Sequence, residues 1–436
     1  MAGEADKATA MWVLRHLRQA GFQALLAGGC VRDMLLGLPC SDYDVATDAT
    51  PQQVQQLFRR VLLVGAKFGV AMVIRRGQRV EVTTFRTDLS YSDGRRPDGV
   101  RFVTAREDAL RRDFTINGMF YDPVADEVLD YVGGREDLRR RVIRTIGDPA
   151  RRFAEDYLRL IRAVRFAVRL GFRIDPATAD AIRAQAPHVT AMSGERIYDE
   201  LSKMLARDTA AQATRLLAEV GLARHILPGL FAEGRWERAM GRLEGVARRK
   251  DLLLSLAALL AELPHGTIVQ TIRGWGASNE IRDGVSWMAE HLGDWRSAGQ
   301  APGEGKGPAM VLCDFKRLRA KKHFDRLRLL WAVEERGSTG GTACARRIAR
   351  RAGSISKERA CPTPFVTGVD LKGMGLTEGP LLGEILHRLY DAQLNEELPT
   401  RRAALKAARK MVASAARDGH AGKVPQETVR RTGSED

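Results

Sequence analysis

Hydrophobic and polar positions follow two different patterns along the chain, and the change between them divides it. Before about residue 148, short apolar runs such as Ala24–Ala27 and Val70–Ile74 are typical of strands, while residues 8–20 have the spacing of an amphipathic helix. Beyond that point the pattern is helical nearly throughout and recognisable strands disappear. The pattern therefore predicts an α+β fold, with strands and helices first and an all-α region after them.

The stretch that follows the first predicted strand carries the strongest chemical signal. Gly28 and Gly29 come directly after the strand, and an amphipathic helix is predicted over Cys30–Leu38, where Pro39 ends it. A second strand is predicted over Ser41–Val45. Glycines before a helix let the backbone approach a phosphate, and the helix N-terminus favours anions.

Two carboxylates lie on the second predicted strand. Because residues two apart in a strand share a face, Asp42 and Asp44 are expected side by side. Such carboxylates repel each other unless a cation lies between them or one of them is protonated. Mg²⁺ prefers oxygen ligands of this type, so we predict that Asp42 and Asp44 hold the metal. Arg32 is expected to donate to phosphates bound nearby.

The combination G-G-x-V-R-D followed by D-x-D resembles the opening motif of nucleotidyltransferases with the DNA polymerase beta type of catalytic domain. Within them it is similar to the bacterial branch of tRNA CCA-adding enzymes and poly(A) polymerases. The resemblance implies a small mixed sheet with helices at the N-terminus and binding of the nucleotide near Gly29. Residues 111–117 (RRDFTIN) match a second motif of the same family. There Arg112 is expected to bind the triphosphate, and Asn117 is expected to hydrogen-bond a ribose hydroxyl.

A third carboxylate and a polar loop complete the predicted catalytic region. In the predicted strand Arg79–Phe85, Glu81 lies on the face opposite Val82, and the resemblance favours Glu81 as a catalytic carboxylate near Asp42 and Asp44. Residues 88–97 are predicted to form a loop that resembles a flexible loop of the family.

The first predicted helix of the all-α region, Arg152–Leu170, offers a way to select a nucleotide without a template. Its polar residues at spacings of three are Asp156, Arg159, Arg162 and Arg165. A carboxylate accepts and a guanidinium donates, so Asp156 and Arg159 together suit the amine and ring nitrogen of cytosine or adenine. Guanine and uracil would leave both groups unmatched, and Arg162 and Arg165 would steady the base or the phosphates. The family motif E-D-x-x-R-x-x-R-A-x-R-F stands here from Glu155 to Phe166.

Composition favours a polyanionic partner. The formal net charge is +16 and the sequence pI is about 10.0. Five cysteines show no metal-ligand spacing, which predicts reduced thiols in a cytoplasmic protein. No apolar run reaches about 18 residues and the N-terminus does not resemble a signal peptide, so we expect no membrane association.

Length and pattern together predict four parts. They are a catalytic domain over 1–147, a nucleotide-selecting helical domain over 148–205, a helical body over 206–300 and a basic, helical, tRNA-binding tail over 301–436 whose C-terminus is disordered. A basic helix is predicted over Arg317–Arg328. Residues 367–394 resemble the tail of CCA-adding enzymes, where Gly379 and Pro380 would begin a helix.

The leading prediction is template-independent addition of CMP and AMP from CTP and ATP to the 3′ end of tRNA, with Mg²⁺ as cofactor. CC-adding, A-adding and poly(A) polymerase activities remain open because the same motifs serve all of them. Residues 63–73 favour the CCA-adding type over a poly(A) polymerase. A catalytically silent RNA-binding protein is the alternative from another class, and the combination of Asp42, Asp44, Arg112 and Asp156 argues against it.

Overall fold

The computed structural model describes residues 2–40, 42–63, 68–89, 99–232, 234–300 and 308–417. The chain divides into two compact units, residues 1–289 and 290–436. The first unit contains the strands and the candidate site. Predictions that concern Ser41, most of the loop over 88–97 and the C-terminal residues after 417 lie outside the described residues.

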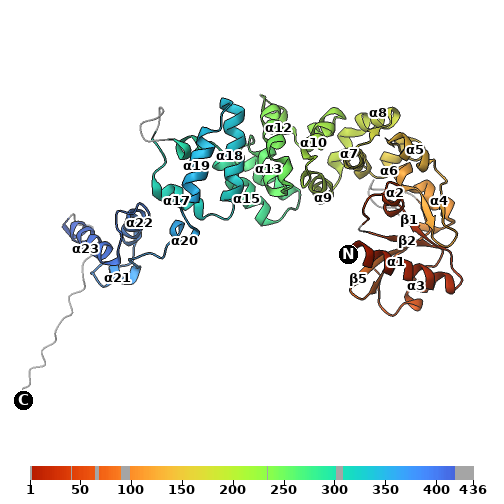
Figure 1. Ribbon diagram of the computed structural model, residues 1–436, viewed down its shortest axis with the longest axis horizontal. Coiled ribbons are helices and arrows are strands. Elements are labelled where there is room, and N and C mark those ends of the chain that lie inside the picture. Colours follow the sequence, from red (N-terminus) through yellow and green to blue (C-terminus); the bar gives the residue numbers. More distant parts are fainter. Residues whose placement is uncertain are drawn as a thin grey trace, which may run out of the picture. The chain divides into compact units, whose positions relative to one another are not determined.

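The strands of the first unit form one large sheet and two small ladders (Figure 1). Their bounds are β1 Ala24–Ala27, β2 Asp44–Thr47, β3 Val61–Leu62, β4 Val70–Arg75, β5 Gln78–Thr84, β6 Arg86–Asp88, β7 Val100–Phe102, β8 Phe120–Asp122, β9 Glu127–Leu129, β10 Val142–Ile143 and β11 Arg173–Ile174. The large sheet has the order β3-β4-β5-β2-β1-β8-β9. Its β2–β5 pair is parallel and its other pairs are antiparallel, so the mixed sheet that the resemblance implied is confirmed.

Helices surround this sheet and then make up the rest of the first unit. Those before residue 148 are α1 Ala2–Gln19, α2 Gly29–Leu35, α3 Pro51–Leu57, α4 Ala105–Arg111, the 3₁₀ turn Thr115–Asn117 and α5 Gly134–Arg140. Those after it are α6 Pro149–Glu155, α7 Leu158–Leu170, α8 Pro176–Gln185, α9 Gly194–Leu205, α10 Ala210–Glu219, α11 Leu222–Ile226, α12 Arg235–Val246, α13 Leu252–Leu260, α14 His265–Gly274 and α15 Asn279–Glu290. Short 3₁₀ turns cover Ala186–Ala191, Pro228–Phe231 and Ala247–Arg249. The region beyond residue 148 is therefore predominantly helical as predicted, with the two-residue strand β11 as an exception to the all-α expectation.

The central strands β1 and β2 are short and mostly buried, and the buried apolar strand predicted over Ala24–Ala27 is confirmed as β1. Leu25 and Ala46 face each other across the ladder, and they pack into a core that includes Phe85 and Phe120. The rings of Phe85 and Phe120 meet edge to face at 5.8 Å. Helix α1 packs on β1, β2 and β5. This core supports β2 and β5, and these strands carry two side chains of the candidate site.

Two local predictions were wrong. The strand predicted over Ser41–Val45 begins only at Asp44, so Asp42 precedes it. The single helix predicted over Arg152–Leu170 is two helices, α6 and α7, because Asp156 has an extended backbone (φ −153°, ψ 104°). The Asp156 carboxylate accepts a hydrogen bond from the N–H of Leu158 at 3.1 Å, and this local bond replaces a helical one.

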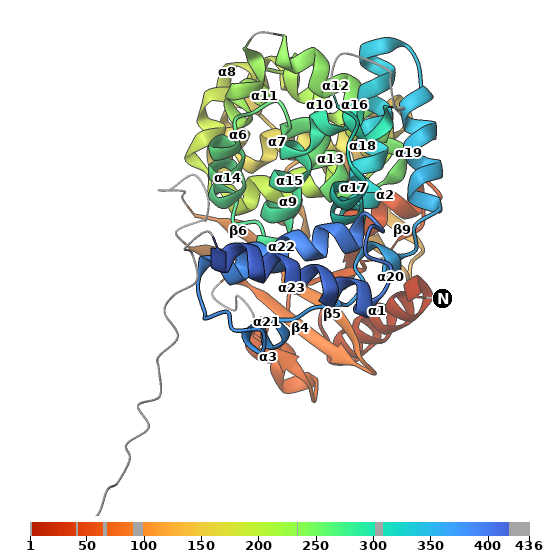
Figure 2. The ribbon, with the colours of Figure 1, turned by 90° about the vertical axis from the view of Figure 1, so that its left-hand side faces the viewer.

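The second unit is also helical. Its helices are α16 Trp295–Gly299, α17 Leu312–Ala320, α18 Phe324–Thr339, α19 Ala343–Gly353, α20 Lys357–Ala360, α21 Gly368–Lys372, α22 Pro380–Leu394 and α23 Arg401–Arg417, with a 3₁₀ turn at Leu292–Asp294. Helix α22 begins at Pro380 as expected, and it lies beside α23 over a small apolar core (Figure 2). The basic helix predicted over Arg317–Arg328 was wrong as one element, because residues 321–323 separate α17 from α18.

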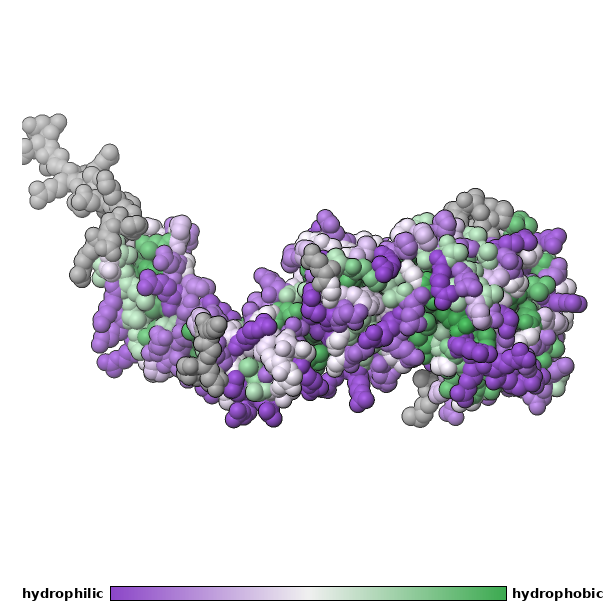
Figure 3. Space-filling view, turned by 90° about the horizontal axis from the view of Figure 1, so that it is seen from above, coloured by the Kyte–Doolittle hydropathy of each residue, from purple (hydrophilic) through white to green (hydrophobic). Residues whose placement is uncertain are grey.

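Figure 3 shows hydrophilic residues over much of the displayed face of both units. Among the described residues, no helix combines the length and the apolar character that crossing a membrane requires.

Candidate active site

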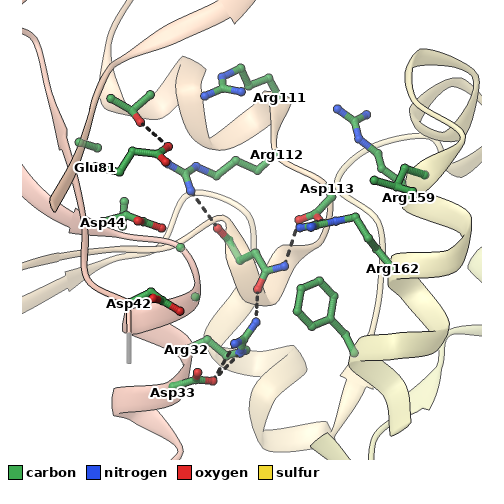
Figure 4. A pocket seen from close by; sticks show the side chains of 18 of the residues that line it. Arg32, Asp33, Asp42, Asp44, Glu81, Arg111, Arg112, Asp113, Arg159 and Arg162 are labelled. Atoms are coloured by element: carbon green, nitrogen blue, oxygen red, sulfur yellow. Dashed lines mark hydrogen bonds and ion pairs between the residues drawn. The ribbon is translucent and has the colours of Figure 1, made fainter. Parts of the chain in front are cut away.

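One pocket in the first unit, with a volume of about 610 Å³, gathers the residues singled out in the sequence. It lies between the ends of β2 and β5, the segment before the 3₁₀ turn Thr115–Asn117, and helix α7 (Figure 4). Every predicted site residue lines it: Gly29, Arg32, Asp42, Asp44, Glu81, Arg112, Asn117, Asp156, Arg159, Arg162 and Arg165. Residues more than a hundred positions apart thus meet in one cavity.

The acidic side of the pocket is formed by Asp42, Asp44 and Glu81 (Figure 4). The parallel register pairs Val45 with Val82, so the preceding residues Asp44 and Glu81 stand level on adjacent strands. Burial, reinforced by the charges of Glu81 and Asp42 and opposed by Arg112, raises the pKa of Asp44 to about 7. The negative charge of these three carboxylates is therefore only partly balanced by the neighbouring Arg112.

These carboxylates fit a divalent cation, because a cation would relieve their repulsion and oxygen donors suit hard metal ions. Asp42 and Asp44 would hold the ion, with Glu81 beside them. Among the described residues, no group of three or more His, Cys, Asp or Glu side chains is arranged so that it could hold a metal ion by itself. Further ligands would therefore come from water or from the substrate, as is usual for Mg²⁺.

Arg32 and Asn117 bind each other instead of standing apart. The Arg32 Nη1 donates to the Asn117 Oδ1 at 2.6 Å, and its Nε donates to Asp33 at 2.8 Å. Arg32 is only 2% exposed, and burial lowers the pKa of its guanidinium despite the nearby Asp33 charge. Arg32 thus lines the pocket and also supports Asn117, and its expected contact with a phosphate stays a prediction.

Asp113 was quoted within a motif but given no role from the sequence, and it is the centre of the site's polar network. Its carboxylate accepts hydrogen bonds from Arg162 Nε and Nη2, at 2.9 and 2.6 Å, and from Asn117 Nδ2 at 3.0 Å. Burial opposes ionisation, but the Arg162 charge and these hydrogen bonds outweigh it and lower the pKa of Asp113 to about 2. Asp113 therefore joins the strand-containing part of the unit to helix α7.

Asp108 is the second residue that sequence reasoning missed. Its buried carboxylate pairs with Arg111 at 2.7 Å and with Arg112 at 3.0 Å. The spacings of three and four residues are those of ion pairs on one helix face, which is a signal that the sequence does contain. Asp108 fixes the two guanidiniums at the edge of the pocket opposite Arg32 (Figure 4).

Gly28 is required where the backbone passes Arg112. Its φ is +73°, and a Cβ on Gly28 would lie 2.9 Å from the Arg112 Nη1. A side chain here would therefore be strained by the backbone and would push Arg112 away from its position over the Phe120 ring.

Asp156 and Arg159 are both held in place at the pocket wall. Asp156 accepts a hydrogen bond from Arg196 at 2.9 Å, and Arg159 donates to the carboxylate of Glu155 at 2.6 Å. Arg196 comes from α9, so a second helix fixes the Asp156 side chain. Because Asp156 lies in the break between α6 and α7, its carboxylate is positioned by this turn rather than by helical periodicity.

Arg162 and Arg165 lie against the ring of Phe166, at 5.2 and 4.3 Å from its centroid. Arg32 packs on the same ring at 5.0 Å. Arg165 also donates to the buried Glu200 at 2.5 Å. These contacts hold a strongly cationic wall rigid, as a site for a polyphosphate requires.

The fold and the pocket together define a nucleotidyltransferase. Residues 24–144 match the family model described as the poly A polymerase head domain, and residues 171–233 match that of a probable RNA and SrmB-binding site of polymerase A. The CCA-adding enzyme of Geobacillus stearothermophilus is 41% identical over 290 residues, which cover 65% of this chain and 70% of that protein. That of Geobacillus thermodenitrificans is 42% identical over 279 residues, covering 63% and 67%.

Solved structures of CCA-adding enzymes share the fold of this chain. The crystal structure of the Bacillus stearothermophilus CCA-adding enzyme in complex with CTP matches with a TM-score of 0.75 and 31% identity, covering 94% of this chain and 98% of that one. The Thermotoga maritima CCA-adding enzyme complexed with tRNA shares the fold at a TM-score of 0.62 and 18% identity, covering 93% and 95%. The chain belongs to the family of CCA-adding enzymes. Enzymes of this family generally depend on a divalent metal ion.

Proposed function

We propose that the chain adds CMP and AMP, from CTP and ATP, to the 3′ end of tRNA without a nucleic-acid template, with Mg²⁺ as its metal. The observation that carries this is that a single pocket contains both the acidic side of Asp42 and Asp44 and the Asp156–Arg159 wall. Relatives named CCA-adding enzymes, and the related structure in complex with CTP, support the same activity.

In the proposed reaction, the oxygen of the RNA 3′-hydroxyl bonds to the α-phosphorus of the nucleotide, and the hydroxyl proton is released to solvent. The bond from that phosphorus to the bridging oxygen of the leaving group breaks, and pyrophosphate departs. A divalent ion, when bound, stabilises the charge that develops on the phosphate oxygens. Asp42 and Asp44 hold that ion, Glu81 adds negative charge beside them, and Gly29 keeps the wall free of a side chain.

Cationic residues on the other walls would bind the triphosphate. Arg112 is aimed into the pocket by Asp108, and Arg162 is fixed by Asp113. Arg165 extends the same wall, while Arg32 acts through Asn117 by holding that amide. Asn117 would hydrogen-bond the ribose. A guanidinium remains charged throughout the physiological pH range, so this wall attracts polyphosphate at any working pH.

Base selection would rest on Asp156 and Arg159. The carboxylate accepts from the exocyclic amine of cytosine or adenine, and the guanidinium donates to the neighbouring ring nitrogen. Guanine and uracil present a carbonyl and a protonated ring nitrogen instead. Each buried group left unmatched costs about 1–3 kcal/mol, so two mismatches are enough to exclude them.

The four predicted parts, 1–147, 148–205, 206–300 and 301–436, belong to this proposal as catalytic, nucleotide-selecting, body and tRNA-binding regions. The chain's net charge of +16 supports a tRNA partner. A cytoplasmic location is also proposed, and it is supported by five cysteines that are all unpaired.

Product length tests the function. The full chain is incubated with Mg²⁺, CTP and ATP and with tRNA transcripts that lack the terminal CCA or carry a terminal C or CC. Completion of CCA on each transcript and then a stop is expected. Addition of CC alone, of A alone or of a long A tract would indicate one of the alternative activities, and binding without incorporation would indicate a silent RNA-binding protein.

A further inference from the structure

A second, smaller cavity of about 340 Å³ adjoins the nucleotide pocket. The two cavities share Asp42, Arg165 and Arg169, so Asp42 and these two arginines of α7 stand between them. The other walls of the second cavity come from the end of α9, from the start of α10 and from the turn that joins them. These walls contribute Lys203, Met204, Arg207, Thr209 and Ala213.

The lining of this cavity is cationic, and most of its cations are already paired. Arg169 pairs with Asp33 at 2.8 Å, and Arg165 and Lys203 share the carboxylate of Glu200. Lys203 also pairs with Asp199 at 2.6 Å. The carboxylates neutralise these side chains in part and fix them in position.

Arg207 differs from its neighbours. Its Nε donates to the backbone carbonyl of Lys203 at 3.2 Å, which orients the guanidinium. Within the described part of the chain, no carboxylate forms an ion pair with Arg207, and the side chain is exposed. An oriented guanidinium with uncompensated charge, at the mouth of a cavity that leads to Asp42, is suited to a phosphate group.

The location of the cavity indicates which phosphate group Arg207 would bind. Nucleotidyl transfer is in line, so the attacking hydroxyl approaches the α-phosphorus from the side opposite the leaving pyrophosphate. Arg111, Arg112 and Arg159 line the nucleotide pocket but not the second cavity (Figure 4). Because Asp42 lines both cavities, a strand that occupies the second cavity reaches Asp42 without crossing these three arginines.

We propose that this cavity is the subsite for the 3′-terminal nucleotides of the RNA primer, and that Arg207 binds a phosphodiester of that end. The inference rests on the proposed function and goes beyond it by assigning the entry side and the contacting residue. Arg169 and Lys203 add positive charge to the same wall, while Thr209 offers a hydroxyl to the ribose-phosphate backbone.

The test is the kinetics of Arg207→Ala in the full chain, measured with primer and nucleotide varied separately. We expect the KM for tRNA to rise about tenfold or more, as for loss of one charge-assisted hydrogen bond, with the KM for CTP and ATP unchanged. Arg248→Ala is the matched control, because Arg248 is also exposed and cationic but lies outside both cavities. The KM of Arg248→Ala for tRNA should differ from that of the wild type by less than twofold.

Primers with a single methylphosphonate near the 3′ end identify the phosphate. Neutralising the linkage that Arg207 binds should raise the KM of the wild type for the primer about tenfold. The same primer should not raise the KM of Arg207→Ala any further. Additive effects at each of the last three linkages would overturn the proposal, as would equal effects of the two arginine variants. A raised inhibition constant for pyrophosphate in Arg207→Ala would assign the cavity to the leaving group instead.

The proposed function and the primer subsite are contradicted by different results. If the wild type incorporates neither CMP nor AMP on any RNA, the proposed function fails. If the wild type is active and Arg207→Ala is indistinguishable from it, with an unchanged melting temperature, only the primer subsite is wrong.

Discussion

Replacing Asp113 with asparagine removes one charge at the point where the strand-containing part of the first unit meets helix α7. Asparagine keeps the shape, so the change tests the carboxylate and not the packing. The carboxyl group is buried, and its pKa falls from the ordinary 3.8 to about 2 because of Arg162 and Asn117. At roughly 1.4 kcal/mol per pKa unit, the ionised form contributes about 2 kcal/mol to the free energy of unfolding at pH 7.

The sign of the pH dependence follows from the lowered pKa. The contribution is complete above pH 3.8 and is lost as the pH falls through about 2, because the unfolded chain takes up the proton first. Asp113→Asn should therefore lower the free energy of unfolding by about 2 kcal/mol at pH 7 and by only about half as much at pH 3.

Urea unfolding of both proteins, followed by circular dichroism at the two pH values, measures this difference. Asp180→Asn is the control, because Asp180 pairs with Arg183 on the surface with side chains 75% and 53% exposed. That variant should change stability by less than about 0.5 kcal/mol. An unchanged stability of Asp113→Asn, or a loss that is the same at both pH values, would refute the reasoning.

Three further outcomes are expected. Asp42→Ala should reduce transfer by at least about a thousandfold while filter binding of tRNA stays within about twofold, and a normal turnover rate would rule out its role in holding the metal. Asp156→Ala should lower discrimination against UTP and GTP by roughly 5–150-fold in competition assays, with tRNA affinity little changed; retained selectivity would exclude it as the base-reading group. Gly28→Ala should raise the KM for nucleotide, because its Cβ would lie 2.9 Å from Arg112, whereas Gly37→Ala, at a similar φ of +65° with nothing within 4 Å, should only lower the melting temperature. Equal effects of the two glycine variants on the KM would show that backbone strain, and not Arg112, is responsible.

Local sequence signals were sufficient for the elements that depend on local physics. The apolar run of β1 and the start of α22 at Pro380 both appear as expected, since burial pattern and a proline at the first helical position act over a few residues. The strand pattern marked Asp42 and Asp44 and the family resemblance marked Arg112, and all three line one pocket. Local rules failed at Asp156, where a side-chain hydrogen bond to the backbone ends a helix that periodicity would have continued.

The sequence by itself determined which residue types are present and which short segments carry them: paired carboxylates after glycines, an arginine-rich helix and an excess of positive charge. Only the tertiary structure decided how their charges are shared. Arg32 became a buried support for Asn117, and Asp113 became the junction with Arg162, because these partners lie far apart in sequence and meet only when α7 packs against the sheet-containing part. Ion pairs and hydrogen bonds act over a few ångströms, so the partner of each charge is decided by packing, which no local pattern specifies.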